Sequence, residues 1–447
     1  MTIPPRTIPP RSIPSRSTPP RTAAGTVAGV LDVAVDVVDV AVDVMDVVVD
    51  VVGIGADGWD GLSPRSRAVL TQAPVVVGGE RQLALLPEQP DQRRLRLPTP
   101  LRRGLSDLLD SAVSPAGPVA VLASGDPLLS GIGGTLVELL GAARVRIHPA
   151  VSSVSLAAAE MRWPLAGVDV VSLVGRDPAT LRRVLSPGRR VLALSADEHT
   201  PAAVAGLLIE AGFGPSWLTV LGDLGTPQQS RIDLTASDFR GPVSRLNILA
   251  IDCVAVPGTP PRPLVGGLPD DAFDHDGQLT KRDARASALA RLAPAPGQLL
   301  WDVGAGAGSV AIEWSRVDPR CRAVAIERDP ARAARIAGNA AALGVPGLVV
   351  VTGAAPAALA DLPAPDAVFV GGGATAPGLL DTCWAALDSG GRLVVHGVTL
   401  ETERRLVDWH ARVGGELIRL SVERVEPLGS FRGWAPARPI VQWAVTK

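Results

Sequence analysis

The chain has 447 residues, of which 47% are hydrophobic and 3% aromatic, and its formal net charge is −2. This length predicts two or three domains with ample apolar material for buried cores. The near-neutral charge and the scarcity of aromatic side chains argue against a nucleic-acid-binding surface. The three cysteines lie far apart and match no metal-ligand spacing, so we expect reduced thiols, a cytoplasmic location and no metal site.

Residues 1–45 are predicted to be disordered, low-complexity sequence ahead of the fold. The segment 1–22 contains two copies of the five-residue unit Thr-Ile-Pro-Pro-Arg followed by two degenerate copies. Such a Pro-rich segment can neither form a helix nor pack a core. Over 30–52, six aspartates recur every three or four residues among valines. Six carboxylates exclude an ordinary membrane span, and we expect no membrane association. The alternative for this stretch is an amphipathic helix that mediates oligomerisation.

The first folded unit is predicted to span 46–256 and to alternate strands with helices. Strands are expected at 47–52, 75–77, 119–123 and 145–147, and helices at 64–72 and from about 153 to 162. Polar or glycine residues follow the strands or open the helix at Gly53, Gly55, Asp126, Ser152 and Ser153. On their own these residues are as consistent with turns and helix caps as with ligand contacts.

The order of these motifs resembles the tetrapyrrole methylases, and within them the CbiE branch. G-x-G follows the first strand, G-D-P a later one, and P-x-V-S-S opens a helix. The resemblance implies two α/β subdomains with S-adenosylmethionine (SAM) in the cleft between them, bound by the five residues just listed. Val52 departs from the family, which usually has proline before G-x-G.

A Pro- and Gly-rich linker, 257–267, is predicted to precede a second domain over 268–447. That domain is organised around D-x-G-x-G-x-G, which begins at Asp302 after a short apolar strand. A helix over 309–317 follows, and its first N–H groups are free to meet a ligand. The next strand ends on Glu327, where an acid suits a ribose diol.

Two ligand classes use such a loop, and a glycine-rich turn without a ligand is a third reading. A dinucleotide site requires G-x-G-x-x-G, and counted from Gly306 its third glycine falls on Ala311, which that site sometimes accepts. The pattern as written resembles the loop of class I SAM methyltransferases. We therefore expect SAM, with contacts from Asp302, Gly304, Ala305, Gly306, Ala307, Gly308 and Glu327.

From residue 268 onward the chain resembles the CbiT methyltransferase family. P-x-x-x-F and then T-K-R-x-x-R precede the loop, and F-V-G-G-G follows it at 369–373. The resemblance covers almost all of 268–447, implies a homo-oligomer formed through this domain, and places Thr280, Ala354 and Ala355 beside SAM. Ala354 stands where related sequences often have a polar residue.

CbiE-like and CbiT-like halves in one chain resemble the fused CobL family, the decarboxylating precorrin-6Y C5,15-methyltransferases of cobalamin biosynthesis. The implied fold class is α/β: a two-subdomain tetrapyrrole methylase fold followed by a Rossmann-like class I SAM methyltransferase fold. The implied reaction methylates precorrin-6B at C5 and C15 and removes CO2 from the C12 acetate, giving precorrin-8X. The resemblance assigns C15 methylation and decarboxylation to the C-terminal half.

A tetrapyrrole is large, flat and polyanionic, so its site should be an apolar slot with cationic side chains at the rim. The expected rim residues are Lys281, Arg282 and Arg285, for which a solvated basic helix start is the alternative. Gly371 and Gly372 end a strand, where the lack of side chains would admit the reacting carbon.

Methyl transfer to an electron-rich carbon needs positioning rather than a strong base. His396 and Glu401 follow another strand and are candidates for handling a proton, with surface roles as the alternative. Two other functions remain open: a methyltransferase of another substrate such as tRNA, and a half that only binds SAM or a tetrapyrrole as a carrier module.

Overall fold

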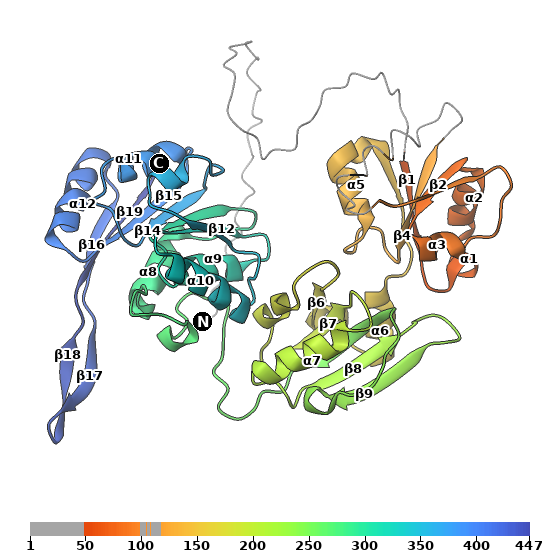
Figure 1. Ribbon diagram of the computed structural model, residues 1–447, viewed down its shortest axis with the longest axis horizontal. Helices are drawn as coiled ribbons and strands as arrows, with labels where there is room; N and C mark the ends of the chain where they lie inside the picture. The colour runs from red at the N-terminus through yellow and green to blue at the C-terminus, as the bar shows by residue number, and fades with distance from the viewer. Residues whose placement is uncertain (1–48, 99–103, 105–107, 109–117) are drawn as a thin grey trace, which may run out of the picture. The chain divides into compact units, whose positions relative to one another are not determined.

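The computed structural model describes residues 49–98, 104, 108 and 118–447, and its ribbon is drawn in Figure 1. The predictions made for residues 1–45 lie outside this range. Within it, the chain forms three main sheets with helices packed on both faces, as expected of α/β folds. None of the described helices is both long enough and apolar enough to cross a bilayer.

The first sheet is parallel throughout, in the order β3-β2-β4-β1-β5. Its strands are β1 (Val49–Ile54), β2 (Val75–Gly78), β3 (Arg93–Arg96), β4 (Val119–Ser124) and β5 (Val145–His148). The flanking helices are α1 (Gly58–Gly61), α2 (Pro64–Gln72), α3 (Glu80–Ala84) and α5 (Ile132–Leu140). Alternate residues of β1 pack on α5 and on α2 with α3, so every residue of this strand is buried.

The second sheet has the order β6-β7-β10-β8-β9, and among its pairs β6 and β7 alone run parallel. Its strands are β6 (Val168–Ser172), β7 (Arg190–Leu194), β8 (Trp217–Gly222), β9 (Ser230–Thr235) and β10 (Asn247–Asp252). Helix α7 (Thr200–Glu210) covers one face and α6 (Ser153–Met161) the other. Residues 253–269, which include the predicted linker, form neither helix nor strand.

The third sheet has seven strands in the order β13-β12-β11-β14-β15-β19-β16. They are β11 (Leu299–Val303), β12 (Arg322–Glu327), β13 (Val349–Thr352), β14 (Ala367–Val370), β15 (Arg392–Gly397), β16 (Glu416–Leu420) and β19 (Ile440–Thr446). Strands β11 to β15 run parallel, and β19 is antiparallel to both of its neighbours. The chain order reverses between β11 and β14, and a crevice at such a switch point is where ligands bind in open α/β sheets.

Five helices cover this sheet. On one face lie α8 (Arg282–Leu292), α9 (Ser309–Val317) and α10 (Pro330–Ala342), and on the other α11 (Leu379–Ala386) and α12 (Leu400–Val413). The predicted helix over 309–317 and the strand ending at Glu327 are confirmed. Short 3-10 helices occupy Ala142–Arg144, Leu165–Gly167, Pro178–Arg183, Ala236–Asp238, Asp270–Ala272 and Ala357–Leu359.

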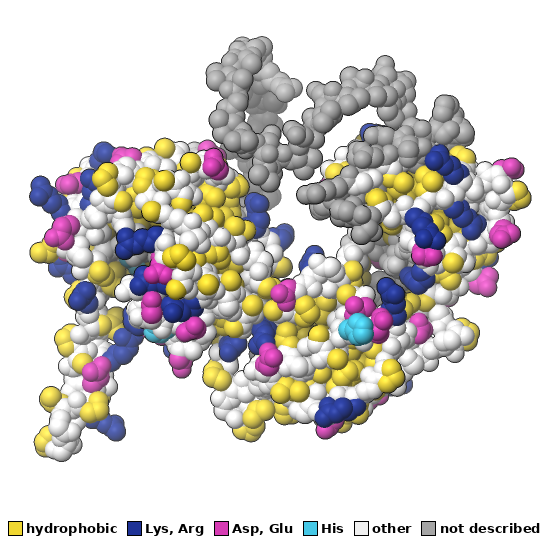
Figure 2. All heavy atoms as spheres, viewed as in Figure 1, with side chains coloured by type: hydrophobic (Ala, Val, Ile, Leu, Met, Phe, Trp, Pro, Cys, Tyr) yellow, Lys and Arg dark blue, Asp and Glu magenta, His cyan; other side chains and the backbone are white. Residues whose placement is uncertain are grey.

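A two-stranded arm, β17 (Glu423–Leu428) with β18 (Phe431–Pro436), extends away from the seven-stranded sheet (Figure 1). Hydrophobic side chains lie along it in Figure 2, and the largest exposures are those of Leu428 at 70%, Phe431 at 79% and Trp434 at 70%. Water contact at three large apolar side chains is unfavourable, so the arm has the character of a contact surface.

Candidate functional sites

A cavity of about 760 Å³ opens at the switch point of the C-terminal sheet. The segments that line it follow β11, β12, β13, β14 and β15, and the stretch 277–281 before α8 closes one side. Most of the predicted C-terminal SAM and substrate residues meet here. Those that line the cavity are Thr280, Lys281, Gly304, Ala305, Gly306, Glu327, Ala354, Ala355, Gly371, Gly372 and His396.

The glycine loop is shaped by its protein neighbours as well as by any ligand. Gly304 and Gly306 have φ of +70° and +58°, a region that L side chains rarely adopt. A Cβ on Gly304 would lie 3.0 Å from the carbonyl oxygen of Gly372, and one on Gly306 would lie 2.6 Å from that of Gln278. The loops after β11 and β14 therefore touch across the switch point. Ala307 and Gly308 lie beyond the cavity lining, at the start of α9.

Asp302 lies buried behind the loop. Its Oδ2 accepts a hydrogen bond of 2.9 Å from the N–H of Ala311, and its Oδ1 has no partner among the described residues. Burial, followed by the nearby charge of Glu327, raises the pKa of Asp302 to about 7. A buried carboxylate with one unpaired oxygen fits a cationic donor, such as the amine of SAM.

Glu327 orients the loop from the end of β12. Its Oε2 accepts from the N–H of Gly306 at 2.9 Å, and its Oε1 accepts from the N–H of Asp329 at 3.0 Å. The side chain is buried yet lines the cavity. A carboxylate oxygen accepts more than one hydrogen bond, so lone pairs remain for a ribose diol.

Two of the three predicted rim residues do not reach the cavity. Arg285 is fully buried, and its Nε lies 2.6 Å from Oε1 of Glu313. It also donates to the carbonyl oxygens of Thr280 and Leu268. Its predicted rim role is therefore replaced by a structural one. Arg282 is exposed outside the cavity lining, which leaves Lys281 from the original set.

The two candidates for handling a proton, His396 and Glu401, lie in different surroundings. His396 is buried at the end of β15 and lines the cavity, and desolvation lowers its pKa to about 4. Glu401 is exposed in the first turn of α12 and lies outside the lining. Hydrogen bonds with its own backbone N–H and with Thr399 lower the pKa of Glu401, as suits a carboxylate at a helix start. Glu401 is therefore a surface residue, which was the alternative to a proton-handling role.

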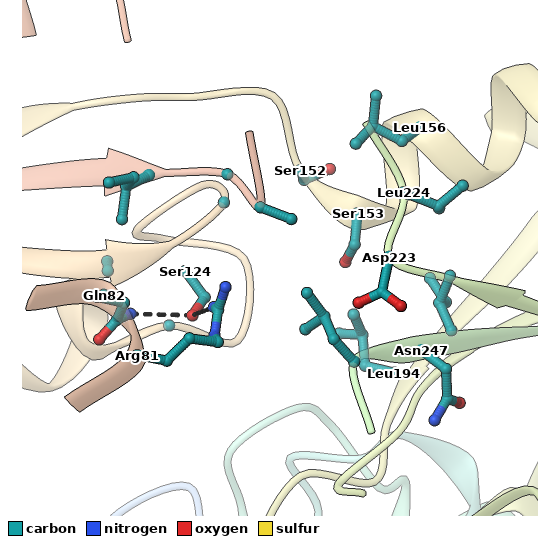
Figure 3. A pocket seen from close by; sticks show the side chains of 18 of the residues that line it. Arg81, Gln82, Ser124, Ser152, Ser153, Leu156, Leu194, Asp223, Leu224 and Asn247 are labelled. Carbon is teal, nitrogen blue, oxygen red and sulfur yellow. Dashed lines mark hydrogen bonds between the residues drawn. The ribbon is translucent and has the colours of Figure 1, made fainter. Parts of the chain in front are cut away.

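A second cavity, of about 850 Å³, lies in the N-terminal half between the first and second sheets (Figure 3). Four of the five residues expected to contact SAM in this half line it: Gly55, Asp126, Ser152 and Ser153. Gly53 does not, because it packs against the chain: a Cβ there would lie 2.2 Å from the carbonyl oxygen of Gly125.

Two residues of this cavity are both structural caps and cavity-lining groups. Ser152 Oγ accepts from the N–H of Ser155 at 3.0 Å and caps α6, and Asp126 Oδ1 accepts from the N–H of Leu128 at 2.8 Å. The sequence offered the cap and the ligand contact as alternatives, and the geometry is compatible with both at once.

Sequence reasoning missed the polar groups on the walls of this cavity. Arg81 and Gln82 of α3 donate to Ser124 Oγ at 3.2 and 2.9 Å, and Asp223 lies on the facing wall (Figure 3). Burial lowers the pKa of Arg81, and the charge of Asp223 partly offsets this. No motif marks these residues; Ser124 directly before G-D-P was the available signal.

The C-terminal cavity likewise gains three arginines that sequence reasoning did not name: Arg328, Arg332 and Arg438. Arg332 pairs with Asp276 at 2.8 Å. Arg328 directly follows Glu327 and Arg332 comes soon after it in the chain, and that proximity was the available signal.

Family models match both halves of the chain. Residues 48–239 match the tetrapyrrole (corrin/porphyrin) methylases, and residues 271–447 match the precorrin methyltransferase domain. A curated relative from Sinorhizobium sp., named precorrin-6Y C(5,15)-methyltransferase [decarboxylating], is 46% identical over 88% of this chain and 95% of its own length. The chain belongs to the precorrin-6Y C5,15-methyltransferase (decarboxylating) family. The family and the α/β fold class expected from the sequence are thus confirmed.

The chain is similar to two further proteins of the same name. The relative of the same name from Mycobacterium tuberculosis is 46% identical over 88% of this chain and 98% of its own length. A solved structure of the C-terminal domain of precorrin-6Y C5,15-methyltransferase from Rhodobacter capsulatus is 47% identical, covers 42% of this chain and all of that chain, and has a TM-score of 0.40.

Proposed function

We propose that this methyltransferase acts on precorrin-6B, adds methyl groups at C5 and C15, and removes CO2 from the C12 acetate to give precorrin-8X. The observation that carries the proposal is the match, over 88% of the chain, to relatives named for this reaction. The two cavities, one in each half, supply a separate site for each methyl transfer.

SAM is the proposed methyl donor in both cavities, and when bound it supplies an electrophilic sulfonium methyl group. In the C-terminal half the unpaired Oδ1 of Asp302 would receive its amine, Glu327 its ribose hydroxyls, and the alanines 354–355 its adenine edge. Thr280 and the loop 304–306 would enclose the remainder. In the N-terminal half the proposed contacts come from Gly55, Asp126, Ser152 and Ser153.

The tetrapyrrole would be held through its carboxylate arms. The cations that line the C-terminal cavity are Lys281, Arg328, Arg332 and Arg438. In the N-terminal cavity they are Arg81 and Arg245. Arginine pairs with carboxylates through two parallel hydrogen bonds, which orients a flat substrate as well as binding it. Gly371 and Gly372 leave room for the reacting carbon.

The proposed division of labour follows the two halves. We assign C5 methylation to 46–256, and C15 methylation with decarboxylation to 268–447, joined by the linker 257–267. The absence of helix and strand over the described residues 253–269 supports a boundary there. A homo-oligomer through the C-terminal domain is also proposed, supported by the exposed apolar side chains of the β17–β18 arm.

Mass spectrometry of products from precorrin-6B and methyl-labelled SAM tests the function. Two labelled methyls with loss of one CO2 are expected. Replacing Gly304 and Gly306 by valine in one protein, and Gly53 and Gly55 in another, should each remove a different methyl, with the untouched half as the internal control. One methyl from the wild-type enzyme would indicate that one half is only a carrier module. Label found in tRNA and not in the tetrapyrrole would favour the rival function.

A further inference from the structure

His396 and Gln442 face each other across the only antiparallel contact of β15, among the described strands. The strand register pairs these two residues, and His396 Nε2 lies 2.9 Å from Gln442 Oε1. Both side chains are buried, and the rings of Phe369 and His396 pack in a T-shaped arrangement with 4.9 Å between their centroids. The imidazole is therefore held in one orientation from two adjacent strands.

The direction of the hydrogen bonds sets the tautomer of His396. Ser287 Oγ of α8 accepts from Nη1 of Arg291 at 2.9 Å and from Nε2 of Gln442 at 3.2 Å. The amide nitrogen of Gln442 thus points to Ser287, and its amide oxygen points to the imidazole. Because an amide oxygen only accepts, Nε2 of His396 must carry the hydrogen. The other ring nitrogen, Nδ1, is left with a free lone pair.

Nδ1 has no hydrogen-bond partner among the described residues, and His396 lines the cavity. Val370 pairs with Val395 in the sheet, so Gly371 and His396 occupy equivalent places at the ends of neighbouring strands. The charged groups that line the same cavity are Lys281, Glu327, Arg328, Arg332 and Arg438, and the charge of Arg291 on α8 also acts on the imidazole. Within the described part of the chain none of them donates a hydrogen bond to the ring, which keeps Nδ1 available to a substrate.

We propose that His396 is a catalytic proton shuttle of the C-terminal half, in which Nδ1 takes the proton from the newly methylated carbon and delivers it to the carbon that loses CO2. This inference rests on the proposed function and adds a residue-level role to it. Gln442 is the positioning residue, because it fixes the tautomer without reaching the cavity lining.

The step balances without any outside acid or base. The nucleophilic carbon forms a bond to the methyl group of SAM while the S–CH3 pair returns to sulfur. The carbon–carboxylate bond breaks, CO2 leaves, and its electron pair moves into the iminium created by methylation, leaving an exocyclic C=CH2 group. Nδ1 then removes the proton of the methylated carbon, and the CH2 terminus takes that proton to become CH3. One methyl enters, one CO2 leaves, and no net proton is exchanged.

The test uses the full chain, precorrin-6B and methyl-labelled SAM, and follows the finished product by mass and absorption spectrum. His396→Asn removes the base in a side chain of similar bulk. In this variant the C-terminal half should form its methylated and decarboxylated tetrapyrrole about 10²- to 10⁴-fold more slowly than in wild type. This is the usual range for the contribution of general acid–base catalysis. SAM affinity, measured by calorimetry, should stay within about twofold, which a merely structural defect would not allow.

Gln442→Glu supplies a second, directional test. A carboxylate still accepts from Nε2, but its charge favours the imidazolium, so the acid limb of kcat/KM should move to higher pH by about 1–3 units. His410→Gln, on α12 outside the cavity lining, is the matched control and should behave as wild type.

Finished product from His396→Asn at the wild-type rate would overturn the shuttle while leaving the proposed function intact. An unmoved acid limb in Gln442→Glu would likewise overturn it. If the wild-type enzyme neither methylates nor decarboxylates precorrin-6B, the proposed function and this inference fail together.

Discussion

The guanidinium of Arg285 and the carboxylate of Glu313 form a buried ion pair, with 2.6 Å between Nε and Oε1. Glu313 also accepts from the N–H of Leu268 at 3.0 Å and from that of Gly267. The pair therefore ties helices α8 and α9 to the segment that enters the C-terminal domain. That segment continues into residues 277–281, which line the cavity.

Removing one partner of this pair should strongly destabilise the C-terminal domain. Glu313→Leu leaves the buried Arg285 with a single, longer carboxylate contact, to Asp270 at 3.3 Å, and a loss of about 3–5 kcal/mol is expected. The double variant Arg285→Met/Glu313→Leu should recover much of that loss. Calorimetric unfolding checks both, with the transition of the N-terminal half as the control. A single variant that unfolds within about 1 kcal/mol of wild type would show that Asp270 or water compensates the remaining charge.

Asp302→Asn should weaken SAM binding and should make the ligand-free protein more stable at high pH. The pKa of Asp302 is about 7 in the folded protein, above the usual 3.8. Its protonated carboxyl therefore contributes fully to the free energy of unfolding below pH 3.8, and that contribution is lost as pH rises through 7. A shift of this size is worth about 4 kcal/mol. The ligand-free wild type should therefore lose stability as pH rises towards about 8, and the Asn variant should lose much less.

SAM binding should show the opposite dependence at Asp302. The ionised carboxylate pairs with the SAM amine, so affinity should rise with pH through about 7 in the wild type and stay flat and about tenfold weaker in Asp302→Asn. Calorimetric titration across this range measures it. Equal affinity of both proteins at each pH would remove Asp302 from the proposed site.

Lys281→Ala and Arg282→Ala form a matched pair of neighbouring cations. Lys281 lines the cavity and Arg282 does not, although both are exposed. Lys281→Ala should raise KM for precorrin-6B several-fold, with a smaller rise at high salt, because a charge-assisted contact to a carboxylate is screened. Steady-state kinetics should find Arg282→Ala unchanged. A raised KM in Arg282→Ala with an unchanged KM in Lys281→Ala would show that Arg282, and not Lys281, contacts the substrate.

The apolar arm predicts a change of assembly. Phe431→Lys with Trp434→Lys should convert the proposed oligomer into a smaller species, measured by light scattering after size exclusion. Val349→Lys is the control, since Val349 is 53% exposed on β13, an edge strand of the seven-stranded sheet, and is not part of the arm. A wild-type monomer, or an oligomer that survives both arm substitutions, would contradict the prediction.

Local patterns predicted most of the elements that carry the sites. The proline at 64 and the apolar run at 119–123 mark α2 and β4, and the glycine loop at 304–308 marks the turn before α9. Each signal is contained in a few consecutive residues, so no tertiary information was needed. Family resemblance added Thr280, which does line the cavity.

The sequence alone does not show the role of a residue whose partners lie far away along the chain. Arg285 lies in a basic helix start and resembles a rim residue until Glu313, 28 positions away, is placed beside it. Glu401 and His396 are close in the chain, yet one lies on a solvated helix turn and the other faces the cavity. The tautomer of His396 depends on Gln442 and Ser287, which come from two other elements.

The antiparallel placement of β19 has a consequence for synthesis of the protein. His396 and Gln442 stand 46 positions apart, and α12 and the β17–β18 arm lie between them. The glycine loop and Glu327 leave the ribosome well before either residue. A nascent chain therefore acquires the parts of its nucleotide pocket first, and the orientation of the imidazole is set only when β19 joins the sheet.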